Sequence, residues 1–188
     1  MTEQNRYSVL MSVYYKEKPE YLRDSMMSIF HQTVQTDNFV LVCDGPLSDS
    51  LNSVICEMEE TYSSALHVHR LKKNHGLGNA LNFGMKYCTN SLVARMDSDD
   101  ISRPDRCEKE LRIFESNPSL SIVSGIVEEF TTTPDHIEAR RVVPETQEKI
   151  LEFAKMRNPF NHPCVMYRKE DVQNAGGYKD FYLLEDYF

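Results

Sequence analysis

The chain has 188 residues, 40% of them hydrophobic and 27% charged, and its formal net charge is −8. This length suits one well-packed domain, and the composition is ordinary for a globular protein. The acidic balance excludes general electrostatic attraction to nucleic acid, and no apolar stretch approaches the roughly 18 residues that span a bilayer. No signal-peptide pattern opens the chain, so we predict a cytoplasmic protein with at most peripheral association with the inner face of the membrane.

The first 118 residues alternate between strand and helix patterns. Helices are predicted from Pro19, from Ser48 or Asp49, after Gly76 and from Pro104, because apolar residues recur there at spacings of three and four. Apolar runs predict four strands, at Tyr7–Tyr14, Phe39–Cys43, His67–Leu71 and Ser91–Met96. Repeated β-α units predict an α/β fold with a mostly parallel, Rossmann-like sheet flanked by helices.

The pattern changes after residue 118. No helix separates the strands predicted at Leu120–Val127 and Ala139–Val143, and a helix is predicted over about residues 145–156. The segment His162–Arg168 and a short helix closed by Gly176 and Gly177 follow. Without a repeat or a flexible linker, we expect a single domain over 1–188, in which 1–118 binds a nucleotide and 119–188 is a smaller mixed portion for a second substrate.

Two features of the composition carry further expectations. The five cysteines are scattered without a metal-site spacing, and those on helical apolar faces, Cys56, Cys88 and Cys107, are predicted to be small buried hydrophobes. The last eight residues, from Phe181 to Phe188, are largely aromatic and apolar, whereas chain ends are usually polar. We therefore expect a C-terminally truncated chain.

Three carboxylates, Asp97, Asp99 and Asp100, follow the fourth predicted strand directly. In open α/β sheets, ligands bind beyond the carboxyl ends of the strands, and Asp44 ends the second strand in the same way. Asp97 and Asp99 are two residues apart, so in extended backbone both point to one side. Such a pair suits a hard divalent ion, Mg²⁺ or Mn²⁺, that holds a diphosphate.

Three other interpretations of these segments were weighed. A calcium EF-hand loop starting at Asp97 is rejected, because Ile101 and Ser102 stand where a ligand and a glycine are required. A dinucleotide fingerprint at Gly76–Gly78 fails, because Leu81 occupies the third glycine position. A solvated acidic turn that caps the helix after Pro104 remains open.

Seven motifs in order carry a resemblance to a known family. They are Ser8–Tyr15, Leu22 through Thr33, Leu41–Gly45, Asn74–Gly84, Met96–Asp100 with Pro104–Arg106, His162–Arg168 and Leu184–Phe188. On these motifs the chain resembles the family 2 glycosyltransferases, which are inverting enzymes with the GT-A fold. The resemblance covers nearly the whole chain.

The resemblance implies roles for the acidic stretch. Asp97, Ser98 and Asp99 match the DxD motif, whose carboxylates bind the metal that bridges the diphosphate of a nucleotide-sugar. Asp99 is the expected direct ligand, and Asp97 would contact both the metal and the nucleotide. Ser98 and Asp100 would lie at the donor sugar or the pyrophosphate, where Asp100 orients the sugar or a metal-bound water.

The resemblance also implies a nucleotide site. Asp44 matches the acid that contacts the base, usually uracil, because a carboxylate can accept a hydrogen bond from the uracil imide N–H. The alternative is that Asp44 forms the turn before Gly45. Ser12 and Tyr14 would line the nucleotide site, with Tyr14 either stacked on the base or part of the core. Lys73 and Asn74 would approach a phosphate or the ribose, unless the turn they precede serves only helix packing.

Three more residues receive roles from the resemblance. Arg106 either reaches the diphosphate or pairs with Asp105 or Glu110. His162 lies near the pyrophosphate or the acceptor, or is structural. Asp186 matches the catalytic base that deprotonates the acceptor hydroxyl in a single displacement, with an exposed acid near the chain end as the alternative.

The sequence therefore predicts a metal-dependent, inverting transfer from a UDP-sugar to a glycan or lipid-linked glycan, as in surface polysaccharide synthesis. A sugar-phosphate nucleotidyltransferase is one alternative, but such enzymes carry a glycine-rich loop after the first strand, and the segment Tyr14–Pro19 has no glycine. A catalytically silent nucleotide-sugar-binding module is the other, and the presence of Asp97, Asp99 and Asp186 argues against it.

Overall fold

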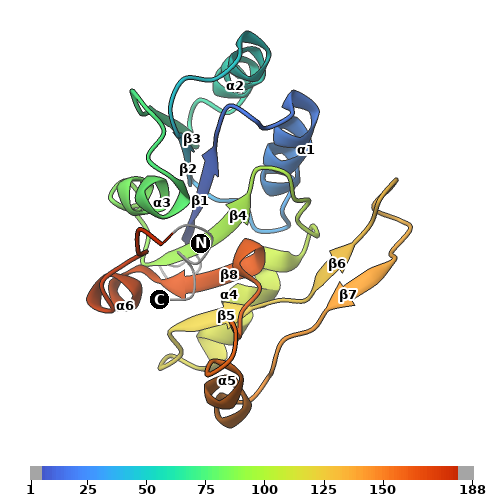
Figure 1. Ribbon diagram of the computed structural model, residues 1–188, viewed down its shortest axis with the longest axis vertical. Helices are drawn as coiled ribbons and strands as arrows, with labels where there is room; N and C mark the ends of the chain where they lie inside the picture. Colours follow the sequence, from blue (N-terminus) through green and yellow to red (C-terminus); the bar gives the residue numbers. More distant parts are fainter. Residues whose placement is uncertain (1–5, 182–188) are drawn as a thin grey trace.

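A six-stranded sheet forms the centre of the computed structural model, which describes residues 6–181 (Figure 1). The strand order is β3-β2-β1-β4-β8-β5. The parallel strands are β1 (Tyr7–Val13), β2 (Asn38–Cys43), β3 (Leu66–Arg70) and β4 (Leu92–Asp97). At the other edge, β8 (Val165–Arg168) runs antiparallel to both β4 and β5 (Ile122–Ser124). The predicted α/β fold with a mostly parallel sheet is confirmed.

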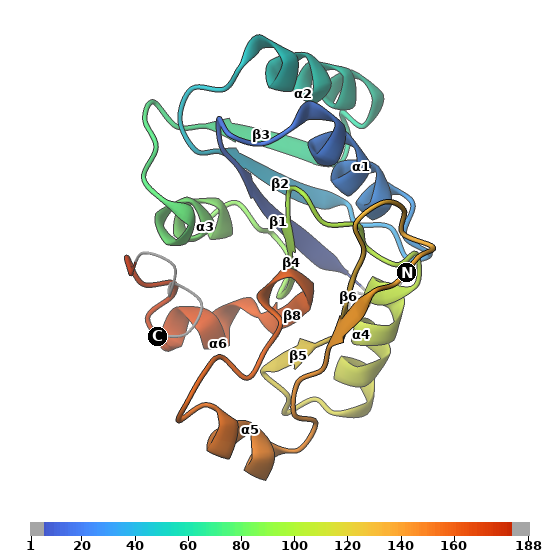
Figure 2. The ribbon, with the colours of Figure 1, turned by 45° about the vertical axis from the view of Figure 1, so that its right-hand side comes forward.

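Helices cover both faces of this sheet (Figure 2). On one face lie α1 (Pro19–Phe30), α2 (Asp49–Thr61) and α4 (Arg106–Ser116), and on the other lie α3 (Leu77–Met85) and α6 (Lys169–Asn174). Side chains alternate along each strand, so Val9 and Met11 of β1 join the first core and Leu10 joins the second. A sheet buried on both faces explains why its strands are almost continuously apolar.

Helix α3 packs very closely on the centre of the sheet, and Gly84 permits this. A Cβ atom at Gly84 would lie 2.6 Å from both Leu10 Cδ1 and Val42 Cγ2. The glycine therefore sets the separation between α3 and the strands β1 and β2, whose carboxyl ends point to the acidic stretch.

The region after residue 118 differs from its prediction in several bounds. The single strand expected at Leu120–Val127 is wrong: β5 ends at Ser124, and β6 (Val127–Glu129) pairs with β7 (Ala139–Arg141) in a separate two-stranded sheet. The chain turns away at Gly125, whose N–H donates to Cys164 O, in keeping with the tendency of glycine to mark bends in strands. Helix α5 covers only Gln147–Phe153.

Two further expectations need correction. Helix α4 begins at Arg106 rather than at Pro104, because the Arg106 N–H donates to Arg103 O and closes a turn first. Cys88 and Cys107 are buried as predicted, but Cys56 is exposed. It follows the buried Ile55 by one residue, which places it about 100° around α2 from the apolar face.

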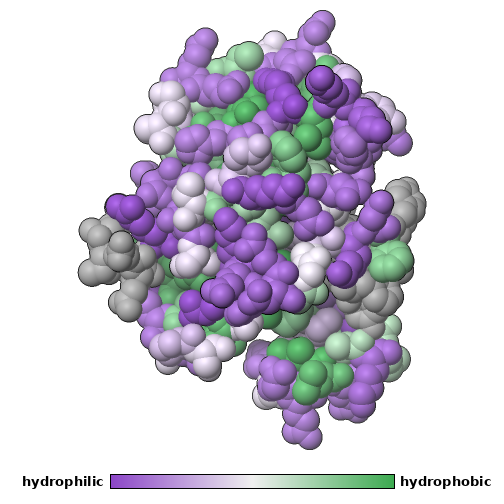
Figure 3. All heavy atoms as spheres, turned by 90° about the vertical axis from the view of Figure 1, so that its left-hand side faces the viewer, coloured by the Kyte–Doolittle hydropathy of each residue, from purple (hydrophilic) through white to green (hydrophobic). Residues whose placement is uncertain are grey.

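Hydrophobic side chains gather on the lobe at the bottom of the molecule, over α5 (Figure 3). No residue of this helix is buried, and Leu151 and the nearby Met156 are largely exposed. Within residues 6–181, no helix is both long and apolar enough to cross a membrane.

Candidate active site

The carboxyl ends of three neighbouring strands bring the predicted site residues together. Ser12 of β1 lies opposite Asp97 of β4 in the parallel register. The backbone N–H of Asp44, directly after β2, donates to Val13 O at 2.8 Å. Ser12, Asp44 and Asp97 therefore share one edge of the sheet, as the strand pattern indicates.

The three carboxylates of the acidic stretch converge. One ligand oxygen from each of Asp97, Asp99 and Asp100 lies within 4.8 Å of the others. Burial, followed by the charges of Asp97 and Asp99, raises the pKa of Asp100 to about 6. Partial desolvation and then the charge of Asp97 raise the pKa of Asp99. An all-oxygen cluster under mutual repulsion fits a hard divalent cation, whose charge would relieve that repulsion.

One cation, Arg95, already lies beside this cluster and was not predicted. Arg95 is 1% exposed within β4, and its Nη2 forms an ion pair with Asp97 Oδ1. The sequence contained a signal for this pair, because Arg95 is a charged residue in a run otherwise made of apolar residues. It stands two positions before Asp97, and the period of two places both side chains on the same side of the strand.

A fourth carboxylate also went unnoticed. The Ser98 hydroxyl donates to Glu17 Oε2 at 2.7 Å, and the charge of Glu17 contributes to the raised pKa of Asp99. Glu17 lies in the loop after β1, so the rule that placed Asp44 and Asp97 at this edge also indicated Glu17. The predicted contact of Ser98 with the donor remains a prediction.

Helix α1 and Gln32, which follows it, hold the backbone of the acidic stretch through hydrogen bonds. The Ser25 hydroxyl donates to Asp97 O at 2.7 Å, and Ser28 Oγ accepts the Ser102 N–H at 3.0 Å. The Gln32 side chain donates to Arg103 O at 2.8 Å. These bonds fix the backbone of the loop that carries Asp99 and Asp100.

Asp44 is buried and organises the turn before α3. Its Oδ1 and Oδ2 accept the backbone N–H groups of His75 at 2.8 Å and Gly76 at 3.0 Å. The turn crosses so close that a Cβ at Gly45 would lie 2.7 Å from Asn74 N. The turn-forming role is thus present, while each carboxylate oxygen keeps a second lone pair for a base N–H.

The other predicted nucleotide residues border this turn and the end of β1. Lys73 and Asn74 are exposed, and Asn74 Nδ2 donates to Asp44 O at 3.2 Å. Tyr14 is 42% exposed and meets Tyr15 edge-on, so the alternative that it belongs to the core is wrong. Stacking of Tyr14 on a base remains a prediction.

Arg106 takes one of its two predicted roles, the pairing with a nearby acid. Its Nε donates to Glu110 Oε1 at 3.1 Å, and its Nη2 donates to Arg95 O at 2.8 Å and Val165 O at 3.1 Å. Its Nη1 donates to Pro163 O and to a methionine sulfur, so all five N–H groups of the guanidinium have protein acceptors. Pairing with Glu110 is the alternative that the structure shows, and no donor is left for a diphosphate.

His162 lies in a buried polar cluster beneath β4. Its Nε2 is 3.2 Å from Tyr178 Oη, which is 3.3 Å from Tyr167 Oη. Burial, and then the charge of Arg95, holds the pKa of His162 well below its ordinary value. The imidazole is therefore neutral at pH 7. Asp186, the predicted base, lies outside the described residues.

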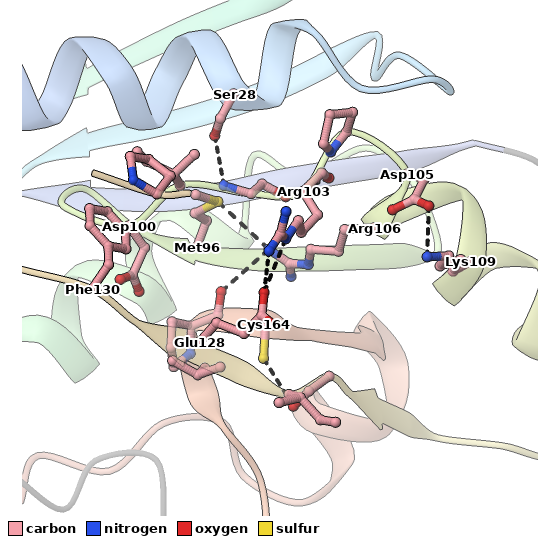
Figure 4. A pocket seen from close by; sticks show the side chains of 18 of the residues that line it. Ser28, Met96, Asp100, Arg103, Asp105, Arg106, Lys109, Glu128, Phe130 and Cys164 are labelled. Atoms are coloured by element: carbon pink, nitrogen blue, oxygen red, sulfur yellow. Dashed lines mark hydrogen bonds and ion pairs between the residues drawn. The ribbon is translucent and has the colours of Figure 1, made fainter. Parts of the chain in front are cut away.

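A cavity of about 580 Å³ opens beside the acidic stretch (Figure 4). It lies between the loop that follows β4 and the β6–β7 hairpin, and Asp100, Phe130 and Cys164 line it. Arg103 of the loop forms an ion pair with Glu128 of β6 across the cavity. The cavity is therefore lined both by residues after position 118 and by Asp100 of the carboxylate cluster.

Comparison with known proteins gives consistent results. The model of the family described as "Glycosyl transferase family 2" matches residues 8–174. The amylovoran biosynthesis glycosyltransferase AmsE of Erwinia amylovora is 43% identical over 182 residues, which cover 96% of this chain and 66% of that protein. The UDP-Gal:alpha-D-GlcNAc-diphosphoundecaprenol beta-1,3-galactosyltransferase of Escherichia coli is 40% identical, covering 97% of this chain and 65% of that protein. The chain spans about two thirds of the length of these curated relatives.

Solved structures show the same fold. The mannosyltransferase PcManGT from Pyrobaculum calidifontis, in complex with GDP-Man and Mn²⁺, superposes with a TM-score of 0.71 at 17% identity, over 97% of this chain and 50% of that one. S. aureus TarS 1-349 in complex with UDP-GlcNAc gives 0.72 at 18% identity, over 97% and 51%. At these identities the likeness shows a common fold.

Proposed function

Because the chain belongs to glycosyl transferase family 2 and has the GT-A fold, we propose that it transfers a sugar from a UDP-sugar to a glycan or lipid-linked glycan acceptor. The transfer inverts the anomeric centre, depends on Mn²⁺ or Mg²⁺, and serves the synthesis of a surface polysaccharide. It takes place at the cytoplasmic face of the membrane, where the acceptor lipid is anchored.

One observation carries this proposal. The carboxylates of Asp97, Asp99 and Asp100 converge within 4.8 Å at the carboxyl edge of the sheet, beside Ser12 and Asp44. Burial first, and then the repulsion between these acids, raise the pKa values of Asp99 and Asp100, which a compensating ligand would relieve. A divalent cation together with a diphosphate is a ligand that such an edge accommodates.

Asp97 and Asp99 would hold the metal, with Asp100 beside them at the donor sugar. A bound Mn²⁺ or Mg²⁺ would stabilise the negative charge that builds on the departing diphosphate. The protein's own contribution is to hold the carboxylates on a rigid loop, which the Ser25 and Ser28 hydroxyls secure to α1.

The remaining site residues bind the nucleotide and move a proton. Asp44 accepts the uracil N–H, Tyr14 stacks on the base, and Lys73 and Asn74 approach the ribose or a phosphate. Asp186 takes the proton from the acceptor hydroxyl as its oxygen attacks the anomeric carbon and the bond to the diphosphate breaks. Arg106 does not bind the diphosphate, because its N–H groups already have protein acceptors.

We place the acceptor in the cavity lined by Asp100 and Phe130, which makes 119–188 the acceptor side of one domain and 1–118 the donor side. The cavity's position beside the carboxylate cluster supports this assignment. Since the E. coli relative is named for UDP-Gal and GlcNAc-diphosphoundecaprenol, the first donor and acceptor to test are UDP-Gal and a GlcNAc-diphospholipid.

The test is a transfer assay with UDP-sugars, a GlcNAc-diphospholipid and Mn²⁺, on this chain and on a form extended to the length of its relatives. We expect a lipid-linked disaccharide whose new linkage is β when the donor is α, as nuclear magnetic resonance would show. Asp186→Asn should lower the transfer rate by at least about 100-fold, the lower range for general base catalysis.

Asp180→Asn is the matched control, because Asp180 is an exposed aspartate six residues earlier and should leave the rate unchanged. Retention of the α configuration would contradict the inverting mechanism. Full activity of Asp186→Asn would remove Asp186 from the proposal. Absence of transfer from every UDP-sugar in the extended form would contradict the proposed reaction itself.

A further inference from the structure

Arg95 and Asp97 form a close ion pair at the start of the acidic stretch. The period of two along β4 puts both side chains on the same face of the sheet, and Arg95 Nη2 meets Asp97 Oδ1. Among residues 6–181, no other side chain or backbone group is hydrogen-bonded to the Asp97 carboxylate. Its orientation therefore depends on Arg95.

The other donors of Arg95 show why the guanidinium is there. The side chain is 2% exposed, yet Nε and Nη1 have no hydrogen-bond acceptor among residues 6–181. Arg106, by contrast, gives all its N–H groups to protein acceptors. Buried arginines usually have satisfied donors, so the position of Arg95 is explained by the ion pair with Asp97 rather than by a network of backbone contacts.

Two opposite effects on a bound cation follow from this arrangement. The positive charge of Arg95 repels a cation at Asp97, which would weaken metal binding. Against this, a ligand carboxylate that is already held by a hydrogen-bonded neighbour does not have to be ordered when the metal binds. The Asp97 side chain is 34% exposed, so it would turn freely into solvent if its partner were removed. We expect this loss of order to outweigh the relief of charge repulsion.

We propose that Arg95 is a positioning residue of the metal site, which holds the Asp97 carboxylate toward Asp99 and Asp100 and thereby raises the affinity for the divalent ion. This inference rests on the proposed function, because it requires that the acidic cluster binds a metal. It assigns to a residue inside the sheet a part in ion affinity that needs no contact between that residue and the ion.

The test is isothermal titration of Mn²⁺ in the presence of UDP, on the wild type, Arg95→Met, Arg95→Lys and Arg103→Met. Methionine matches the length of the arginine stem without its charge, and lysine keeps the charge but not the planar fork. Arg103→Met is the matched control, since Arg103 follows the same acidic stretch but pairs with Glu128. UDP binding without metal is measured in parallel.

We expect Arg95→Met to weaken Mn²⁺ binding by about 10–100-fold, the usual effect of removing a partner of a metal ligand, and Arg95→Lys by less. The metal-free UDP affinity of every variant, and the Mn²⁺ affinity of Arg103→Met, should match the wild type. In the Asp97→Asn background, Arg95→Met should change Mn²⁺ affinity by no more than about threefold, since the coupled partner is already gone.

Equal or tighter Mn²⁺ binding by Arg95→Met would overturn the proposal, because charge repulsion would then outweigh ordering. If Arg95→Met does not fold, Arg95→Lys and the comparison in the Asp97→Asn background, where residue 97 carries no charge that Arg95 must pair, decide the matter. Metal-independent UDP binding by the wild type is a different failure, since it would contradict the metal site itself.

Discussion

Replacing Arg106 by methionine should lower the free energy of unfolding. It should not affect nucleotide binding by the molecules that remain folded. The side chain is 10% exposed and pairs with Glu110, which is 6% exposed. Burial raises the pKa of Glu110 despite the opposing charge of Arg106, so the carboxylate depends on its partner to stay ionised. The carbonyl oxygens of Arg95 and Val165 also lose their donor.

The magnitude follows from these contacts. Breaking a buried ion pair by removing one partner costs about 3–5 kcal/mol, a large share of the roughly 5–15 kcal/mol by which a domain is stable. With a urea m-value of about 2 kcal/mol/M, the midpoint of unfolding should fall by roughly 1.5–2.5 M. Urea titration followed by circular dichroism measures this change.

Arg112→Met is the matched control on the same helix. Arg112 pairs with Glu108 at the same spacing of four residues, but its side chain is 70% exposed, so the expected loss is below about 1 kcal/mol. An unchanged urea midpoint for Arg106→Met, combined with a tenfold or greater loss of UDP affinity, would refute the reasoning and return Arg106 to the diphosphate.

Three further predictions concern the turn, the helix packing and the buried histidine. Asp44→Asn leaves one good acceptor for two backbone amides and should lower the free energy of unfolding by about 1.5–3 kcal/mol; an unshifted urea midpoint would speak against the turn-forming role. Gly84→Ala forces a methyl group between α3 and the sheet and should cost about 1–3 kcal/mol, so a melting temperature equal to the wild type would show that α3 can move away freely. The pKa of His162 is lowered on folding from an ordinary value of 6.5, so the unfolded chain takes up this proton first and stability is lost as the pH falls below 6.5. His162→Gln should remove this contribution, which is at most about 1.4 kcal/mol per pH unit, and an unaltered dependence of the urea midpoint between pH 7 and 5 would contradict it.

Hydrophobic periodicity was sufficient to predict the fold of the first 118 residues. The strands β1, β2 and β4 lie between covering helices, so their apolar runs are long; Asp44 follows β2 directly and Asp97 ends β4. That pattern, with the rule that parallel strands present their carboxyl ends at one edge, was enough to bring Asp44 and Asp97 together. The strands β5, β6 and β7 are three residues long and half-buried or exposed, so their pattern is weak.

Side-chain pairings were less predictable than side-chain positions. Arg106 had neighbouring acids on its own helix, and its preference for Glu110 depends on acceptors from Pro163 and Val165, 57 and 59 residues further along the chain. Only tertiary structure brings those carbonyl oxygens to α4. Arg95, however, was visible as a charge within a buried strand, and the same period of two that paired Asp97 with Asp99 would have paired Arg95 with Asp97.

The most direct test of the account is isothermal titration of UDP with and without Mn²⁺, on the wild type and on Asp99→Ala. The account predicts that UDP binds tightly only when Mn²⁺ is present and that Asp99→Ala abolishes this dependence, because the carboxylate cluster would no longer hold the ion. Equal UDP affinity with and without metal in the wild type would contradict a metal-diphosphate site at the end of β4.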